Sequence, residues 1–189
     1  IADFYRYDGV TSVISKGDKH FREGLQIGES NLLKMYGLEA LYGDVKTALN
    51  DPYSVVITDE KAIKYFGKKN VVGEFISIQS FSGSTHDFKV TAVLKEMPQN
   101  SLTELAKGYK NSFFTPVNTL SYFGRTDIES WNNMFIASYV ELKKGVSPKD
   151  LEKPIRQLLQ QNADPGLAKV ITVKPVLLSD YYLQQYNGL

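Results

Sequence analysis

The chain contains 189 residues, of which 42% are hydrophobic and 23% are charged, and its formal net charge is +1. This length fits one domain or two small lobes, and the composition excludes a disordered chain, which combines low hydrophobicity with high net charge. The balanced charge disfavours a nucleic-acid-binding protein, which usually carries a basic surplus. The chain has no cysteine, which excludes disulfides, thiolate nucleophiles and cysteine-ligated zinc.

The ends of the sequence favour an origin in a longer protein. The chain begins at Ile1 rather than at Met and has no signal-peptide pattern, so we expect an excised piece of a longer chain. Residues 175–189 contain a single charged residue, Asp180, and three tyrosines. Tyrosine favours the membrane–water boundary, but an amphipathic tail packed on the domain would have the same composition.

The first part of the chain predicts a hairpin followed by a short helix. Strand-like runs at Val10–Ile14 and His20–Ile27 flank a turn at residues 16–18. A helix over residues 31–36 follows, with Ser30 as its expected cap.

The next segment has the clearest local signals. Residues 54–57 predict a buried strand, and Thr58 is expected to cap a helix whose first turn holds Asp59 and Glu60, where the helix dipole favours negative charge. Gly67 ends this helix. Its predicted apolar face consists of Ala62, Ile63 and Phe66.

The second half of the chain predicts further strands and a long helix. Phe75–Gln79 and Asp87–Leu94 alternate as a hairpin, and Phe113–Val117 and Met134–Leu142 read as two more strands. The helix that follows is expected to start at Ser147 and Pro148, with Asp150 three residues past the cap and a kink or restart at Pro154. Its apolar stripe is Leu151, Ile155, Leu158 and Leu159, and a last strand is predicted at Lys169–Leu178.

Short strands, hairpins and a few helices in irregular order indicate an α+β fold. Motifs of catalysis are missing from the sequence: there is no Gly-x-Gly-x-x-Gly, no Gly-x-Ser-x-Gly and no Ser-x-x-Lys, and the glycine before Lys68-Lys69 does not open a phosphate-binding loop. We therefore expect no enzyme activity and assign no catalytic, cofactor-binding or metal-ligating residue.

The remaining candidates for chemistry have simpler structural explanations. His20 and His86 lie far apart and are expected at the surface. Asp59 and Glu60 fit dipole partners better than an acid–base pair. Trp131 fits a core anchor better than a sugar platform, and the dibasic pairs at 68–69 and 143–144 fit solvated turns.

A series of short motifs, each weak alone, resembles a known family through its order and spacing. The series resembles the MacB-like periplasmic core domain of FtsX-type ABC transporter permeases over roughly residues 20–183. The motifs are Gly43-Asp44, Thr47-Ala48-Leu49, Asp51-Pro52, residues 54–58, Ala62, Lys64-Tyr65-Phe66-Gly67, Val72-Gly73, residues 88–94, Pro98-x-Asn100-Ser101, Trp131, Tyr139-Val140-x-Leu142 and Leu178-x-Asp180-x-Tyr182. The sequence departs from the pattern at Ala92, where glycine is usual, and at Leu32–Leu41, which lacks the usual phenylalanines.

The resemblance implies a two-lobed α+β domain. Residues 1–45 and 135–189 would form a membrane-proximal lobe, and residues 46–134 would form an inserted second lobe. For a loop between two membrane helices, Ile1 and Leu189 should lie within about 20–25 Å of each other at one pole.

The resemblance also implies the setting. The domain would be the periplasmic part of an inner-membrane efflux permease, coupling the cycle of a cytoplasmic ABC ATPase mechanically to substrate export or release. Its partners would be a second permease copy, that ATPase, the membrane through flanking helices, and a periplasmic adaptor or substrate protein, with no cofactor and no nucleic acid.

Two other functions stay open at this point. A ligand-sensing domain of a membrane receptor would share the origin in a longer chain but would need one convergent pocket with several polar groups. A hydrolase is disfavoured by the missing motifs, although carboxylate-based sites leave little trace in a sequence.

Overall fold

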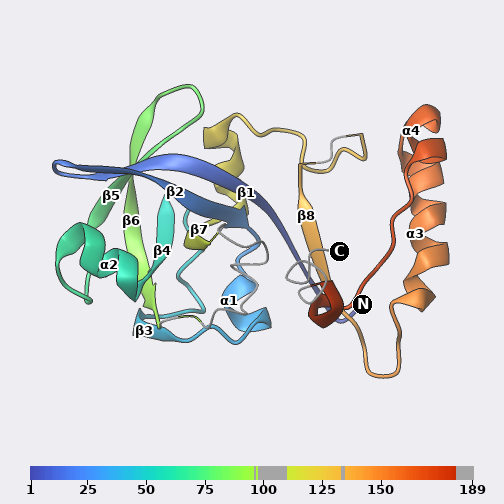
Figure 1. The fold of residues 1–189 in the computed structure, drawn as a ribbon, viewed down its shortest axis with the longest axis horizontal. Helices are drawn as coiled ribbons and strands as arrows, with labels where there is room; N and C mark the ends of the chain where they lie inside the picture. Colours follow the sequence, from blue (N-terminus) through green and yellow to red (C-terminus); the bar gives the residue numbers. More distant parts are fainter. Residues whose placement is uncertain (96, 98–109, 133–134, 182–189) are drawn as a thin grey trace.

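The computed structural model describes residues 1–95, 97, 110–132 and 135–181 (Figure 1). The mixture of many strands with few helices confirms the α+β class. In chain order the elements are β1 (Asp3–Lys16), β2 (Lys19–Gly28), α1 (Leu32–Met35), β3 (Ala40–Gly43), β4 (Ser54–Thr58), α2 (Asp59–Phe66), β5 (Phe75–Gln79), β6 (Thr85–Leu94), β7 (Asn111–Pro116), the 3-10 helix η2 (Val117–Phe123), β8 (Ala137–Glu141), α3 (Lys149–Asn162) and α4 (Pro165–Val170).

Six of the strands close into a barrel. The sheet runs in the order β2-β7-β4-β6-β5-β1-β8, and β1 also pairs with β2, which closes the ring through β1. The predicted turn at 16–18 is confirmed as the tip of the β1–β2 hairpin, where Gly17 has a φ of 57°. The predicted β5–β6 hairpin is confirmed as well. Closure removes free sheet edges within the ring.

Branched and aromatic side chains from all six strands fill the barrel. Alternate residues of a strand point to opposite faces, so Val55 and Ile57 of β4 face inward with Phe113 of β7. Helix α2 contributes Ala62 and Tyr65 to this core. A second core lies against the outside of the barrel and contains Val56, Ala92, Leu94 and Phe114 together with Leu32 and Leu33 of α1.

Strand β1 belongs to two parts of the molecule. Its residues 7–16 pair with β2, whereas residues 3–7 pair with β8 outside the barrel. Figure 1 shows the barrel at the left, β8 near the centre and α3 with α4 at the right. Backbone pairing therefore joins β1 and β2 to strands beyond residue 46, so the expected boundary at residues 45–46 does not separate the sheet. The division into a membrane-proximal and an inserted lobe stays a prediction.

Helix α2 follows the predicted position but not every predicted contact. Thr58 has the extended backbone of a capping residue and Gly67 is left-handed, yet the Thr58 side chain makes no capping hydrogen bond. The prediction of the apolar face is wrong at Ile63, which is 47% exposed. Tyr65, rather than Ile63, packs into the barrel core. Similarly, Ser30 does not cap α1, whose N-cap position is Asn31.

Helix α3 runs unbroken through Pro154, although a restart was expected there. The helix is largely exposed, so water can bind the carbonyl group that the proline leaves without a partner. It begins at Lys149, one residue later than expected, so Pro148 rather than the predicted Ser147 takes the N-cap position. The Asp150 carboxylate accepts the N–H of Ser147 at 2.7 Å.

The strand predicted at Lys169–Leu178 is wrong. Residues 165–170 form α4 instead, and residues 171–177 are not paired as a strand. Asp164 accepts hydrogen bonds from the N–H groups of Gly166 and Leu167, and Pro165 occupies the first helical position. These are strong helix-start signals, which outweigh the alternation that follows.

No helix in the described ranges is both long and apolar enough to cross a membrane.

Candidate functional site

A cluster of tyrosines joins the outer strands to the barrel. The rings of Tyr5 and Tyr7 on β1 stack with centroids 5.4 Å apart, and Tyr7 stacks on Tyr139 of β8 at 6.0 Å. Tyr36, which follows α1, packs edge-on against Tyr5 and Tyr139. Burial, followed by the nearby Tyr7, raises the pKa of Tyr36 to about 12. Burial also raises the pKa values of Tyr5 and Tyr139, so these phenols stay protonated and neutral at physiological pH.

The last described residue approaches this cluster. Tyr181 lies close enough to raise the pKa of both Tyr7 and Tyr139. At the other end of the chain, Ala2 donates its N–H to the carbonyl of Glu141 at 2.7 Å, which places the N-terminus at the end of β8. The predicted proximity of Ile1 and Leu189 itself stays a prediction, because Leu189 lies outside the described residues.

Hydrogen bonds and ion pairs fasten the same end of β1. Asn31 donates to the side chain of Asp3 at 2.9 Å and to the carbonyl of Phe4 at 2.7 Å. Arg6 pairs with Glu29 at 2.8 Å and with Glu129 at 3.0 Å. Because alternate residues of a strand face opposite sides, the tyrosines pack on one face of this end of β1 and the ion pairs of Arg6 lie on the other.

A second ion pair holds the segment after η2 against β1. The guanidinium of Arg125 donates to the buried carboxylate of Asp8 at 3.0 Å. Burial raises the pKa of Asp8, and the arginine offsets part of this effect. This pair places the loop that follows η2 beside the middle of β1.

A buried carboxylate ties α2 to the barrel. Glu23 of β2 contacts Lys61 at 2.8 Å and Lys64 at 2.7 Å, and it accepts a hydrogen bond from Tyr65 at 3.2 Å. Burial opposes ionisation of Glu23, but the hydrogen bonds from the two lysines outweigh burial and lower its pKa.

We predict that Glu23→Gln lowers the free energy of unfolding by about 1–2 kcal/mol at neutral pH, because the buried Lys61 loses its counter-charge. A carboxylate with a lowered folded-state pKa stabilises the fold above its unfolded pKa of about 4.3, and this contribution disappears as the pH falls through the folded value. The difference between wild type and variant should therefore shrink below about pH 4. Urea unfolding of wild type and variant, at neutral pH and below about pH 4, measures this difference in stability.

The matched control is Glu74→Gln. Glu74 also pairs with two lysines, Lys16 and Lys68, but it lies at the surface. This variant should change stability little at either pH. A cost of Glu23→Gln that persisted undiminished at low pH would contradict the electrostatic account.

Open grooves lie along α3. One of about 340 Å³ runs between α3 and residues 171–174. Its lining contains Lys149, Lys153, Arg156 and Lys174. A second groove of about 380 Å³ lies where β8, the loop at 142–148 and residues 175–178 meet. Only Leu159 is buried in α3, so this helix presents most of its surface to solvent.

The structure does not bring the sequence candidates together. His20 and His86 are both exposed, on β2 and β6, and His86 stacks on Tyr53 with centroids 3.8 Å apart. Asp59 pairs with Lys69 at 3.1 Å, in keeping with a surface role at the start of α2. Trp131 is 42% exposed, so the predicted core anchor is wrong. The loop that contains Trp131 is held to β1 by the ion pairs of Arg125 and Glu129 instead.

Within the part of the chain that the structure describes, no group of three or more acidic or histidine side chains is arranged to hold a metal ion. The motif at 98–101 and Tyr182 lie outside the described residues.

The sequence did not predict the tyrosine cluster, because its members come from β1, β8 and the end of α1. The only features of the sequence that point to this cluster are the alternation Tyr5-x-Tyr7 and the total of 12 tyrosines.

Comparisons with solved structures support the fold. A domain of a protein assigned as a permease from Porphyromonas gingivalis has a TM-score of 0.66 and 22% identity, covering 86% of this chain and 65% of that domain. The periplasmic region of MacB from Actinobacillus actinomycetemcomitans has a TM-score of 0.62 and 16% identity, covering 100% of this chain and 77% of that one. The extracellular domain of the noncanonic ABC-type transporter YknZ from Gram-positive bacteria has a TM-score of 0.61 and 18% identity, covering 92% and 78%.

The chain thus spans just under two thirds of the Porphyromonas domain. No curated protein sequence matches it. The model of one family, the MacB-like periplasmic core domain, matches residues 4–158, which is most of the chain. This match confirms the resemblance drawn from the motif series, and the chain belongs to the MacB-like periplasmic core domain family.

Proposed function

We propose that the domain is a mechanical coupling module of an ABC transporter permease in the inner membrane. It would transmit the cycle of a cytoplasmic ATPase to substrate export or release on the outer side, without catalysing a reaction itself. Two copies of the permease would act together, with an adaptor or substrate protein as a further partner. The part that contains the start of β1, β8, α3 and α4 would face the membrane.

The observation that carries this proposal is the continuity of β1. One strand of 14 residues pairs with β8 at its start and with β2 and β5 farther along. A displacement at the membrane side would therefore enter the barrel through covalent backbone and ladder hydrogen bonds rather than through a linker. Domains joined by flexible linkers move independently by default.

The tyrosine cluster adds stiffness at the point where β1 leaves the barrel. Tyr5 is 1% exposed and its hydroxyl donates to Gln26 of β2 at 3.2 Å. Tyr139 extends the stack onto β8 through Tyr7. Closely packed aromatic groups resist bending, so the two parts of β1 should move as one body.

We predict that Tyr139→Ala weakens this coupling while costing about 1–2 kcal/mol of stability, which leaves the domain folded. The test uses the full permease with its ATPase in proteoliposomes. Spin labels attached at Gln157→Cys on α3 or at Asp18→Cys in the distal hairpin turn report distances between the two copies. The chain contains no native cysteine that would also take up the label. Addition of nucleotide should change the distance at both sites.

In the Tyr139→Ala background, the nucleotide-dependent change should persist at residue 157 and be largely lost at residue 18. Tyr42→Ala is the matched control, because Tyr42 on β3 is exposed and lies outside the cluster. Equal distance changes in both variants, or no response to nucleotide in the wild type, would overturn the proposal.

A second candidate is ligand sensing, which the groove between α3 and residues 171–174 favours. Its lining combines four basic residues and Glu152 with the apolar Ile155, Leu159 and Val173, which gives a concave site of mixed polarity. A sensor would respond to ligand rather than to nucleotide, so the same distance measurements distinguish the two functions.

A further inference from the structure

The two dibasic turns of the chain differ in their surroundings. Lys68 pairs with Glu74 at 3.0 Å, and Lys69 pairs with Asp59 at 3.1 Å. Among the described residues, neither Lys143 nor Lys144 takes part in an ion pair. The nearby Asp150 is engaged with the N–H of Ser147. The first pair is thus neutralised locally, whereas the second has no acidic partner in the part of the chain that the structure describes.

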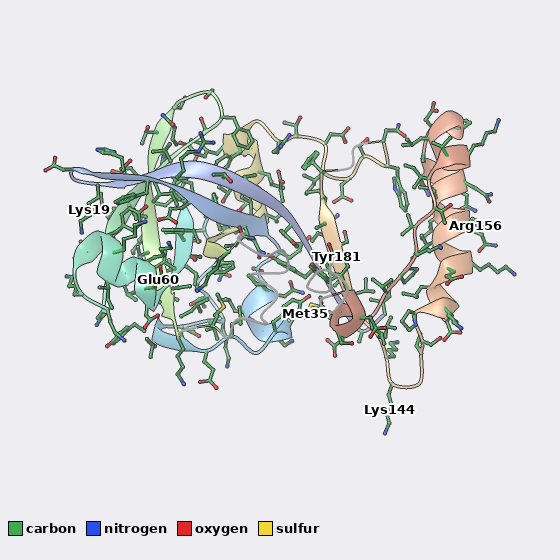
Figure 2. The ribbon with its side chains drawn as sticks, in the orientation of Figure 1. Lys19, Met35, Glu60, Lys144, Arg156 and Tyr181 are labelled. Atoms are coloured by element: carbon green, nitrogen blue, oxygen red, sulfur yellow. The ribbon has the colours of Figure 1, made fainter. Side chains whose placement is uncertain are left out.

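Apolar side chains surround the second pair. Val146 is 37% exposed, Val176 is 54% exposed and Leu177 is 50% exposed, and all three line the groove of about 380 Å³ together with the two lysines. We call these five residues the dibasic pole. Figure 2 shows Lys144 projecting from the tip of its loop. Single exposed aliphatic groups are ordinary, but a contiguous set beside lysines is typical of an interaction surface.

Charge is also distributed unevenly along the chain, and the excess of basic residues lies in the segment that contains the pole. Residues 142–181 contain seven basic and four acidic residues, a net charge of +3, while residues 1–141 contain 15 basic and 17 acidic residues, a net charge of −2. Tyr181, 38% exposed, lies in the helical turn next to the pole. Basic, aliphatic and tyrosine side chains together are the composition of segments that lie at a lipid interface.

We propose that the dibasic pole binds the surface of a bilayer that contains anionic phospholipid. Lys143 and Lys144 contact headgroup phosphates, while Val146 and Leu177 reach the boundary of the acyl region. A projecting loop tip that carries two lysines beside exposed aliphatic side chains fits the planar, negatively charged surface of such a bilayer. The inference rests on the proposed function only in placing this end of the molecule toward a membrane.

Co-sedimentation of the 189-residue chain with lipid vesicles tests the proposal. The chain should partition onto phosphatidylcholine vesicles that contain about 30% phosphatidylglycerol, but weakly onto phosphatidylcholine alone, and binding should fall as salt rises from about 0.05 to 0.5 M. The double variant K143S/K144S should lower the partition coefficient roughly 10- to 30-fold, since each lysine near an anionic surface contributes about a factor of five.

The matched control is K68S/K69S, which removes the same charge from the paired turn and should change binding less than about twofold. Val146→Ser should weaken binding several-fold at high salt, where the apolar contact dominates. Equal losses in the two double variants would indicate non-specific attraction and overturn the assignment, as would absence of binding to anionic vesicles. Neither result would affect the distance measurements that test coupling, so the two proposals fail separately.

Discussion

Replacement of Phe113 by alanine should lower the free energy of unfolding by about 3–5 kcal/mol, the range measured when a buried phenylalanine is truncated. Phe113 lies on β7 with no exposed surface, inside the barrel, and its ring packs edge-on against Tyr65 of α2 at 5.8 Å. Its loss would leave a cavity between the barrel and α2. A closed barrel cannot collapse around such a cavity without breaking its ladder, so relaxation should recover little of the cost.

The control is Phe75→Ala, because Phe75 also lies on a barrel strand but is 50% exposed. This variant should cost less than about 1 kcal/mol. Urea unfolding monitored by circular dichroism measures both changes. A similar cost for the two variants would mean that Phe113 does not occupy the tightly packed interior that the barrel geometry gives it.

Local signals predicted the elements whose causes are local. The strand, cap and glycine around α2 lie where the sequence places them, because caps and left-handed glycines act within a few residues. The hairpins of β1 with β2 and β5 with β6 follow from alternation and turn residues. The family resemblance, confirmed over residues 4–158, extended these local predictions to the whole domain.

Features that depend on distant contacts were not predicted. Closure of the barrel needs β1 to pair with strands on both sides, and nothing in residues 3–16 signals this double pairing. The exposure of Ile63 and Trp131 depends on which neighbours arrive from elsewhere in the chain. The tyrosine cluster likewise joins residues more than 100 positions apart, such as Tyr7 and Tyr139. Periodicity reports which side of an element is apolar, but not what covers it.

The Gly43-Asp44 motif illustrates what the structure adds to a resemblance. Gly43 ends β3 with a φ of 89°, and a β-carbon at this position would lie 2.3 Å from the carbonyl oxygen of Thr91 and 2.9 Å from the side chain of Ala92. Gly43 and Ala92 are cross-strand partners. The alanine that replaces the usual glycine at position 92 is therefore accommodated because its partner has no side chain.

We expect Gly43→Ala to lower the free energy of unfolding by about 3–5 kcal/mol, since it adds a backbone clash to an unfavourable positive φ. Gly73→Ala separates the two effects, because Gly73 has a φ of 91° but no atom near the position of an added β-carbon. That variant should cost about 1–2 kcal/mol, the conformational part alone. Chemical denaturation of both proteins measures the difference.

Removing the methyl group of Ala92 should rescue little of this cost. In the double variant Gly43→Ala/Ala92→Gly the side-chain contact disappears, but the closer contact with the carbonyl of Thr91 belongs to the backbone and stays. The double variant should therefore be no more stable than Gly43→Ala, since Ala92 is fully buried and its own loss costs packing. Rescue to the stability of Gly73→Ala would instead place the clash in the side chain. The glycine requirement at position 43 would then depend on residue 92 rather than on the close approach of β3 to β6.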